Sequence, residues 1–152
     1  MIEIKKTVAT IANGAQRCRF RKTADGWTPD WFYLDKRPML RFKDHEWMSL
    51  SVDRPTLTKV VKHGANGLQF TGKHKYYKQT CECSVTVSAA ADGGGFVVET
   101  VYVPKTGDIE IYESGSSFEC PYEYDNSGEA TTVSGQNPVY KHKGDDIISG
   151  LY

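Results

Sequence analysis

The chain has 152 residues, 39% of them hydrophobic and 25% charged, which is the composition of one ordinary globular domain. Nineteen Lys and Arg residues balance nineteen Asp and Glu residues, so the totals argue against a bulk polycation or polyanion. The zero net charge is a cancellation, because residues 1–79 hold sixteen basic and seven acidic side chains, whereas residues 80–152 hold three and twelve. We predict one domain over residues 1–152 whose two halves carry opposite charge.

Alternation of apolar and polar residues dominates the chain and predicts half-buried β-strands. The early predicted strands cover residues 2–13, 17–21, 31–34, 39–42 and 46–52, and the later ones cover 68–70, 75–87, 96–103, 108–113, 118–124 and 139–143. Turn residues separate them at intervals of about 8 to 12 positions, which is typical of all-β folds. We therefore predict a mainly-β fold, a single-domain antiparallel β-sandwich or barrel of about ten short strands.

One segment, near residues 54–63, is predicted to form a short helix. Asp53 is a candidate N-cap, Pro55 lies early in the segment and Gly64 follows it as a stop signal. The buried stripe of this helix would consist of Leu57, Val60 and Val61.

Strand alternation also predicts where the charges point, because neighbouring side chains lie on opposite faces. Cys18 and Phe20 take the apolar side of their strand, which leaves the arginines around them on the outer side. The same reasoning gives a predicted basic patch of Arg17, Arg19, Arg21, Arg41 and Lys43. It gives a predicted acidic patch of Glu110, Glu119 and Glu123.

Three explanations of this charge separation compete. Basic and acidic strands that are neighbours in a sheet would form cross-strand pairs, each contributing a fraction of a kcal/mol. Alternatively, the patches would dock on a second copy or on another protein, where charge complementarity fixes the orientation of binding. In the third explanation, the basic half follows the phosphates of a nucleic acid. Strand order decides among them, and the sequence does not give it.

Aromatic and basic residues are interleaved between Trp27 and Trp47. Trp27, Trp31 and Tyr33 are candidate aromatic anchors, which would stack on bases or sugars or fill pockets of a protein partner. The alternative is that these large side chains fill the core. The segment favours a binding surface without identifying its ligand.

The residue types that most often carry chemistry form no recognisable site. Each cysteine, Cys18, Cys81, Cys83 and Cys120, falls on the apolar side of a predicted strand, which favours core packing over a zinc site or a disulfide. The histidines lack metal-ligand spacing, and the sequence contains neither a nucleophile elbow nor a phosphate-binding loop. We predict no catalytic residue, no metal site and no cofactor, and therefore no enzyme.

The first residues lack the apolar segment of a secretory signal, and no run of about 18 apolar residues is present to span a membrane. A cytoplasmic protein without membrane association is expected. The leading functional hypothesis is a non-enzymatic interaction or assembly module that docks on itself or on another protein through its charged faces. Phage and virion accessory proteins are an analogous setting for small β-domains.

Two alternatives remain. One is a nucleic-acid-binding β-barrel that uses the basic, aromatic-rich N-terminal half. The other is a small-ligand or carbohydrate binder, or a cytosolic enzyme, whose site the sequence does not reveal.

Overall fold

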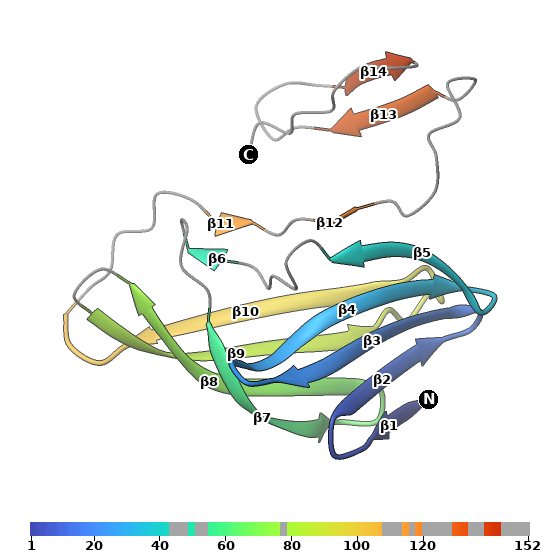
Figure 1. Cartoon of the computed structure of the whole chain (residues 1–152). Coiled ribbons are helices and arrows are strands. Elements are labelled where there is room, and N and C mark those ends of the chain that lie inside the picture. Colours follow the sequence, from blue (N-terminus) through green and yellow to red (C-terminus); the bar gives the residue numbers. More distant parts are fainter. Residues whose placement is uncertain are drawn as a thin grey trace. The chain divides into compact units, whose positions relative to one another are not determined.

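A computed structural model describes residues 1–42, 49–50, 55–76, 79–107, 114–115, 118–119, 129–133 and 139–143 of the chain. These residues form strands and turns, with no helix among them (Figure 1). The chain divides into two compact units, Met1–Pro121 and Tyr122–Tyr152. The described residues of the second unit form an antiparallel pair of strands, β13 (Glu129–Val133) and β14 (Val139–Lys143). The other strands belong to the first unit, and the single domain inferred from sequence stays a prediction.

The first sheet has six strands in the order β1-β2-β3-β4-β5-β12. They are β1 (Ile2–Ile4), β2 (Val8–Asn13), β3 (Gln16–Thr23), β4 (Gly26–Leu34), β5 (Arg37–Phe42) and β12 (Phe118–Glu119). The first five form an antiparallel meander with short turns. In the β4–β5 turn, Asp35 and Lys36 have φ angles of 47° and 68°. Two positive φ angles define the turn type whose twist matches that of antiparallel strands.

The second sheet has four antiparallel strands in the order β10-β9-β8-β7. They are β7 (Thr56–His63), β8 (Gly67–Tyr76), β9 (Gln79–Ala89) and β10 (Phe96–Pro104). A short additional pair is formed by β6 (Ser49–Leu50) and β11 (Ser114–Gly115). The four strands β7 to β10 form a meander like that of the first sheet, because each strand pairs with the one that follows it in the sequence.

The two sheets face each other across one apolar core, which makes this unit a β-sandwich. Core residues come from the inner faces of both sheets: Ala9, Ile11, Cys18, Phe20 and Trp27 from the first, and Leu57, Leu68, Phe70, Cys83, Val85 and Val87 from the second. The centroid of the Phe70 ring lies 4.8 Å from that of Phe20 and 6.1 Å from that of Trp27. Because an aromatic side chain buries about 150 to 250 Å², these three rings supply much of the contact between the sheets.

Two contacts near opposite ends of β3 connect the sheets further. Gly26 has a φ of 115°, and a Cβ there would lie 2.6 Å from the carbonyl oxygen of Leu57 in β7. Glycine alone fits this close approach without a shift of the backbone. Near the other end, Nδ2 of Asn13 donates hydrogen bonds to the carbonyl oxygens of Ala90 (3.0 Å) and Gly95 (2.9 Å) in the β9–β10 loop. The sandwich is therefore held together at its ends as well as through its core.

The helix predicted near residues 54–63 is wrong, because residues 56–63 form β7, an edge strand of the second sheet. Half of the eight residues of β7 are β-branched: Thr56, Thr58, Val60 and Val61. Such side chains favour extended backbone. A bulge between Leu57 and Lys59 shifts the register, so that Leu57 and Val60 both face the core although they are three residues apart. That spacing imitates a helix.

The predicted antiparallel β-sandwich is confirmed by the two packed sheets. Two predicted strands are divided differently, since residues 2–13 form β1 and β2 and residues 75–87 are shared between β8 and β9. The strand predicted at residues 108–113 lies outside the described residues, as does most of those at 46–52 and 118–124.

Candidate functional site

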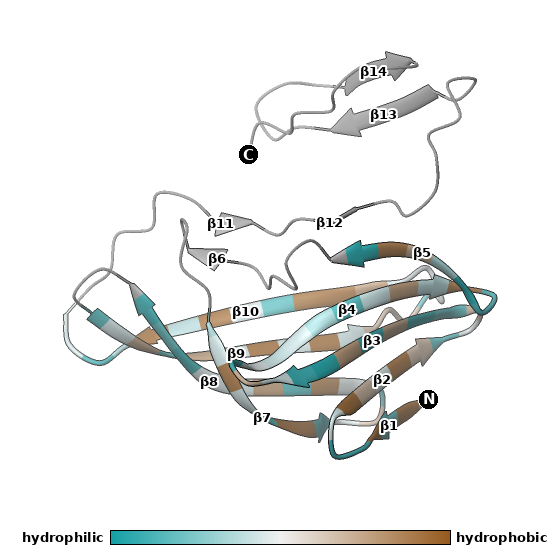
Figure 2. Cartoon of the chain, viewed as in Figure 1, coloured by the Kyte–Doolittle hydropathy of each residue, from teal (hydrophilic) through white to brown (hydrophobic). Residues whose placement is uncertain are grey.

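The outer face of the first sheet carries most of the sequence-predicted contact residues. Cys18 and Phe20 of β3 belong to the core, so the arginines that alternate with them lie on the outer side of β3. Figure 2 shows hydrophilic, teal sections along this strand. Strand register places Tyr33 opposite Arg17, and Trp31 opposite both Arg19 and Arg41. We call the set Arg17, Arg19, Arg21, Trp31, Tyr33 and Arg41 the arginine face. The structure thus brings together four residues of the predicted basic patch and two of the predicted aromatic anchors.

A buried carboxylate orders the middle of the arginine face. Asp30 is only 4% exposed, and Nε of Arg19 donates a hydrogen bond of 2.8 Å to its Oδ2, which Nη2 of Arg19 also contacts. Nε of Arg21 lies 4.0 Å from the other carboxylate oxygen. A buried carboxylate is stable only when it is paired and hydrogen-bonded. Asp30 therefore holds Arg19 firmly and neutralises part of the positive charge.

The aromatic rings order the remaining arginines. The guanidinium carbon of Arg17 lies 4.3 Å from the centroid of the Tyr33 ring, and that of Arg41 lies 5.9 Å from the centroid of Trp31. These are cation–π distances. The two rings are themselves 6.4 Å apart, so rings and guanidinium groups form one continuous layer.

Trp27 is not part of this surface, which corrects its assignment as an aromatic anchor. It is 5% exposed and packs in the core against Phe70. Trp27 and Trp31 are four residues apart and would share a face in a regular strand. The register shift opposite Arg19 and Phe20 makes Asp30 the extra residue of a β-bulge, which reverses the side on which the following residues point.

The same bulge explains why the sequence reasoning missed Asp30. A proline inside a strand is found mainly at edges or bulges, and Pro29 directly precedes Asp30. That dipeptide is the signal that would have identified both the bulge and the outward carboxylate.

The predicted acidic patch is placed only in part. Glu119 of β12 is the register partner of Arg41 of β5, so an acidic and a basic residue are neighbours in one sheet, as the cross-strand explanation requires at this position. Glu110, Glu123 and Lys43 lie outside the described residues.

Three cysteines lie in the core, as predicted. Cys18, Cys81 and Cys83 are buried and free, whereas Cys120 lies outside the described residues. Burial raises the pKa of the Cys18 thiol to about 12. Burial, with a smaller contribution from Cys81, raises the pKa of Cys83 to about 12 as well. Thiols with such pKa values remain protonated at neutral pH and are poor nucleophiles.

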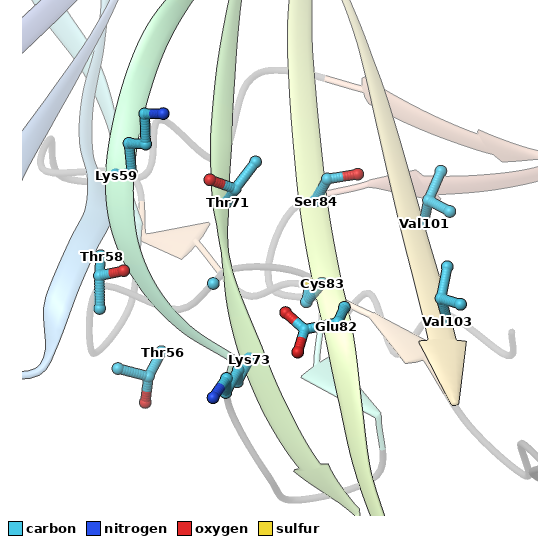
Figure 3. A pocket seen from close by; sticks show the side chains of 11 residues that line it. Thr56, Thr58, Lys59, Thr71, Lys73, Glu82, Cys83, Ser84, Val101 and Val103 are labelled. Atoms are coloured by element: carbon cyan, nitrogen blue, oxygen red, sulfur yellow. The ribbon is translucent and has the colours of Figure 1, made fainter. Parts of the chain in front are cut away.

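A second candidate site is an open hollow of about 690 Å³ on the outer face of the second sheet (Figure 3). Its polar lining consists of Thr56, Thr58, Lys59, Thr71, Lys73, Glu82 and Ser84, with Val101 and Val103 at one side. These side chains are all half-buried or exposed. The hollow therefore lacks the buried, fixed polar groups that orient a small ligand.

Within the described ranges, no group of three or more His, Cys, Asp and Glu side chains is arranged to hold a metal ion. The same residues contain no helix long and apolar enough to cross a membrane. No family model matches the chain, and no curated protein or solved structure matches it either. Of the two candidate sites, the arginine face is the one whose charged side chains are held by a buried carboxylate and by aromatic rings.

Proposed function

We propose that the protein is a non-catalytic docking module that binds an acidic surface of a partner protein through the arginine face. The observation that carries the proposal is the fixed orientation of the guanidinium groups, with Arg17 on the Tyr33 ring and Arg19 on the Asp30 carboxylate. A guanidinium group that is already ordered loses little entropy when it binds a carboxylate. Arg, Tyr and Trp are also the residue types enriched in the energetic centres of protein interfaces.

The balance of charge on the arginine face supports an acidic partner. Four arginines share the face with the buried carboxylate of Asp30, and Glu119 is the register neighbour of one of them, which still leaves an excess of positive charge. A charge-assisted hydrogen bond between an arginine of this face and a carboxylate of the partner contributes about 1.5 to 3 kcal/mol.

Nucleic acid is the second candidate ligand, because arginines beside neighbouring aromatic rings can hold phosphates and stack bases. Two observations make it the weaker one. The guanidinium groups of Arg17 and Arg41 already lie over the rings on which bases would stack, and Trp27, the third candidate anchor, is buried.

The proposal is tested by titrating the protein with a short fluorescent poly-glutamate peptide, and separately with an oligothymidylate of equal charge, at about 50 mM salt. We expect the peptide to bind, and Arg17→Ala combined with Arg41→Ala to weaken it at least about tenfold. These two arginines are chosen because the buried Asp30 carboxylate is bound by Arg19 and Arg21, and both of those stay in place in the double variant.

The matched control is Lys59→Ala with Lys62→Ala, which removes the same charge from exposed positions of β7. If both double variants weaken binding equally, only net charge matters and the proposal is wrong. If the oligothymidylate binds more tightly than the peptide and Trp31→Leu abolishes its binding, the nucleic-acid alternative replaces the proposal.

A further inference from the structure

The edges of the two sheets are protected to very different degrees. An edge strand presents unpaired backbone groups, and proteins limit its pairing by keeping it short, by placing lysines on it or by bulging it. In the first sheet, β1 has three residues and β12 has two. In the second sheet, β7 carries Lys59 and Lys62 together with a bulge. Each of these three edges therefore has a protective feature.

The remaining edge, β10, is neither short nor bulged and carries no lysine, and its proline, Pro104, is its last residue. It has nine residues, pairs with β9 in uninterrupted register and has no strand on its other side among the described residues. Glu99 is its single charged residue. Its four valines are large apolar side chains that are exposed to solvent: Val97 is 58% exposed, Val98 51%, Val101 43% and Val103 55%. Figure 2 shows brown, hydrophobic sections along this strand.

We propose that β10 binds β10 of a second copy of the chain, antiparallel and around a two-fold axis at Thr100, so that the second sheets of the two copies become continuous. The register then pairs Val97 with Val103 of the other copy, Val98 with Tyr102, and Glu99 with Val101. Side chains directly opposite each other share a face and interact most strongly. Val97 and Val103 of the two copies thus cover one another, whereas Val98 packs beside Tyr102.

Alternative registers fit less well. A shift of the partner by one residue would pair inner-face with outer-face positions. An axis at Glu99 would place the two Glu99 carboxylates opposite each other, which is destabilising. An axis at Val101 would leave the first two residues of β10 without an opposite residue, whereas an axis at Thr100 places all nine opposite one another, with Pro104 at the end of the ladder.

The protected edges explain why a second copy is the suitable occupant and why assembly would stop at two. A two-fold contact uses the same surface on both subunits and closes. The outer edges of the joined sheet are then the two β7 strands, whose lysines and bulge oppose further pairing. This interface is separate from the arginine face, so a negative result for the dimer leaves the proposed docking function unaffected, and the reverse also holds.

The dimer is tested by measuring molar mass by light scattering over a concentration series. Because Val101 would face Glu99 of the other copy, a negative and a positive residue at position 101 should have opposite effects on the dimer. We expect Val101→Glu to raise the dissociation constant of the dimer at least about tenfold, through two symmetric like-charge pairs. We expect Val101→Lys, of similar size but opposite charge, to retain the dimer. Val61→Glu on β7 is the matched control at the opposite edge and should leave the dimer intact.

A cross-link tests the register independently. Thr100→Cys places two cysteines on the axis, where antiparallel neighbours are close enough for a disulfide, so mild oxidation should yield a covalent dimer. Val98→Cys would face Tyr102 of the other copy and should not cross-link.

A monomer at every concentration would overturn the proposal, provided that circular dichroism shows a folded protein. A dimer that Val101→Glu and Val61→Glu weaken equally, or one that cross-links through Val98→Cys but not Thr100→Cys, would overturn it as well.

Discussion

The outer faces of the two sheets cover the same core yet have opposite chemical character. On the first sheet, arginines lie on aromatic rings around the buried carboxylate of Asp30. On the second sheet, threonine and serine hydroxyls and flexible lysines line an open hollow that ends at the valines of β10. One face is ordered and cationic, whereas the other is polar at its centre and apolar at one edge.

The inner faces of the two sheets, in contrast, have the same types of side chain. Each supplies aliphatic side chains, phenylalanine and a buried cysteine to one cluster. Because alternation separates the two faces of a strand, the outer residues could diversify without disturbing the core. Residues that bind a partner are therefore expected on the outer faces and edges of the sheets, and substitutions test this difference between inner and outer faces.

The largest effect is expected at Gly72 of the second sheet. A Cβ there would clash with the carbonyl oxygen of Thr56 and lie 2.7 Å from Cα of Leu57, both in the backbone of β7. We expect Gly72→Ala to lower the free energy of unfolding by about 3 kcal/mol, because backbone atoms cannot move aside as a flexible side chain can. Urea denaturation measures this.

Gly14→Ala is the control for Gly72→Ala. Gly14 also has a special backbone, with a φ of 57°, but no atom lies within 4 Å of the position of a Cβ. It should cost only about 1 to 2 kcal/mol from the left-handed conformation. Equal losses at the two glycines would contradict the close approach of β7 to β8.

The next largest effect concerns the ordered face of the first sheet. We expect Asp30→Ala to destabilise the protein by about 2 kcal/mol, since the paired arginine groups lose their acceptor. The loss should persist at high salt because the carboxylate is buried. Asp25→Ala, at an exposed position of the neighbouring turn, should change stability by no more than about 0.5 kcal/mol. Similar losses at both positions would show that Asp30 does not order this face.

The pH dependence of stability tests whether the buried cysteines of the two inner faces have similar environments. The pKa values of Cys18 and Cys83 rise from 9.0 to about 12 on folding, so above pH 9 the unfolded chain releases protons that the folded protein keeps. Stability should therefore fall as the pH rises from 9 towards 12, by about 1.4 kcal/mol per pH unit for each thiol. Replacing either cysteine by alanine should reduce this slope by the same amount. A reduction at only one of the two would mean that the inner faces differ.

The smallest effect is expected from the stacked arginine. Arg17→Ala removes a cation–π contact with Tyr33 and should cost about 0.5 to 1 kcal/mol in thermal unfolding. Lys59→Ala, on the exposed surface of the second sheet, should cost nothing measurable. A larger loss at Lys59 than at Arg17 would reverse the contrast between an ordered and a flexible outer face.

The regular parts of the fold were predictable from sequence, and the irregular parts were not. Alternation correctly placed Cys18 and Phe20 inside and their neighbouring arginines outside. A bulge lies at both departures from the prediction: the one at Asp30 puts Trp27 and Trp31 on opposite sides of β4, and the one between Leu57 and Lys59 interrupts the alternation of β7. Strict alternation of apolar and polar residues does not detect an inserted residue. The bulge near Leu57 places two core residues three positions apart, which is the spacing of a helix.

The arginine face required three-dimensional information for a second reason. Neither the register that sets Tyr33 beside Arg17 nor the pairing of Arg41 with Glu119 follows from local sequence. Both depend on strand order, which decides whether opposite charges meet within a sheet or remain available to a partner.

The hydrogen bonds of Asn13 make the β9–β10 loop sensitive to the chemical ageing of the protein. Asn13 precedes Gly14, and asparagine deamidates most readily before glycine because the unhindered backbone nitrogen can attack the side-chain amide. Deamidation would replace a donor to two carbonyl oxygens with a carboxylate that repels both of them. The tie between the β2–β3 turn and the start of β10 would then be lost, and an aged preparation would loosen first at this end of the sandwich.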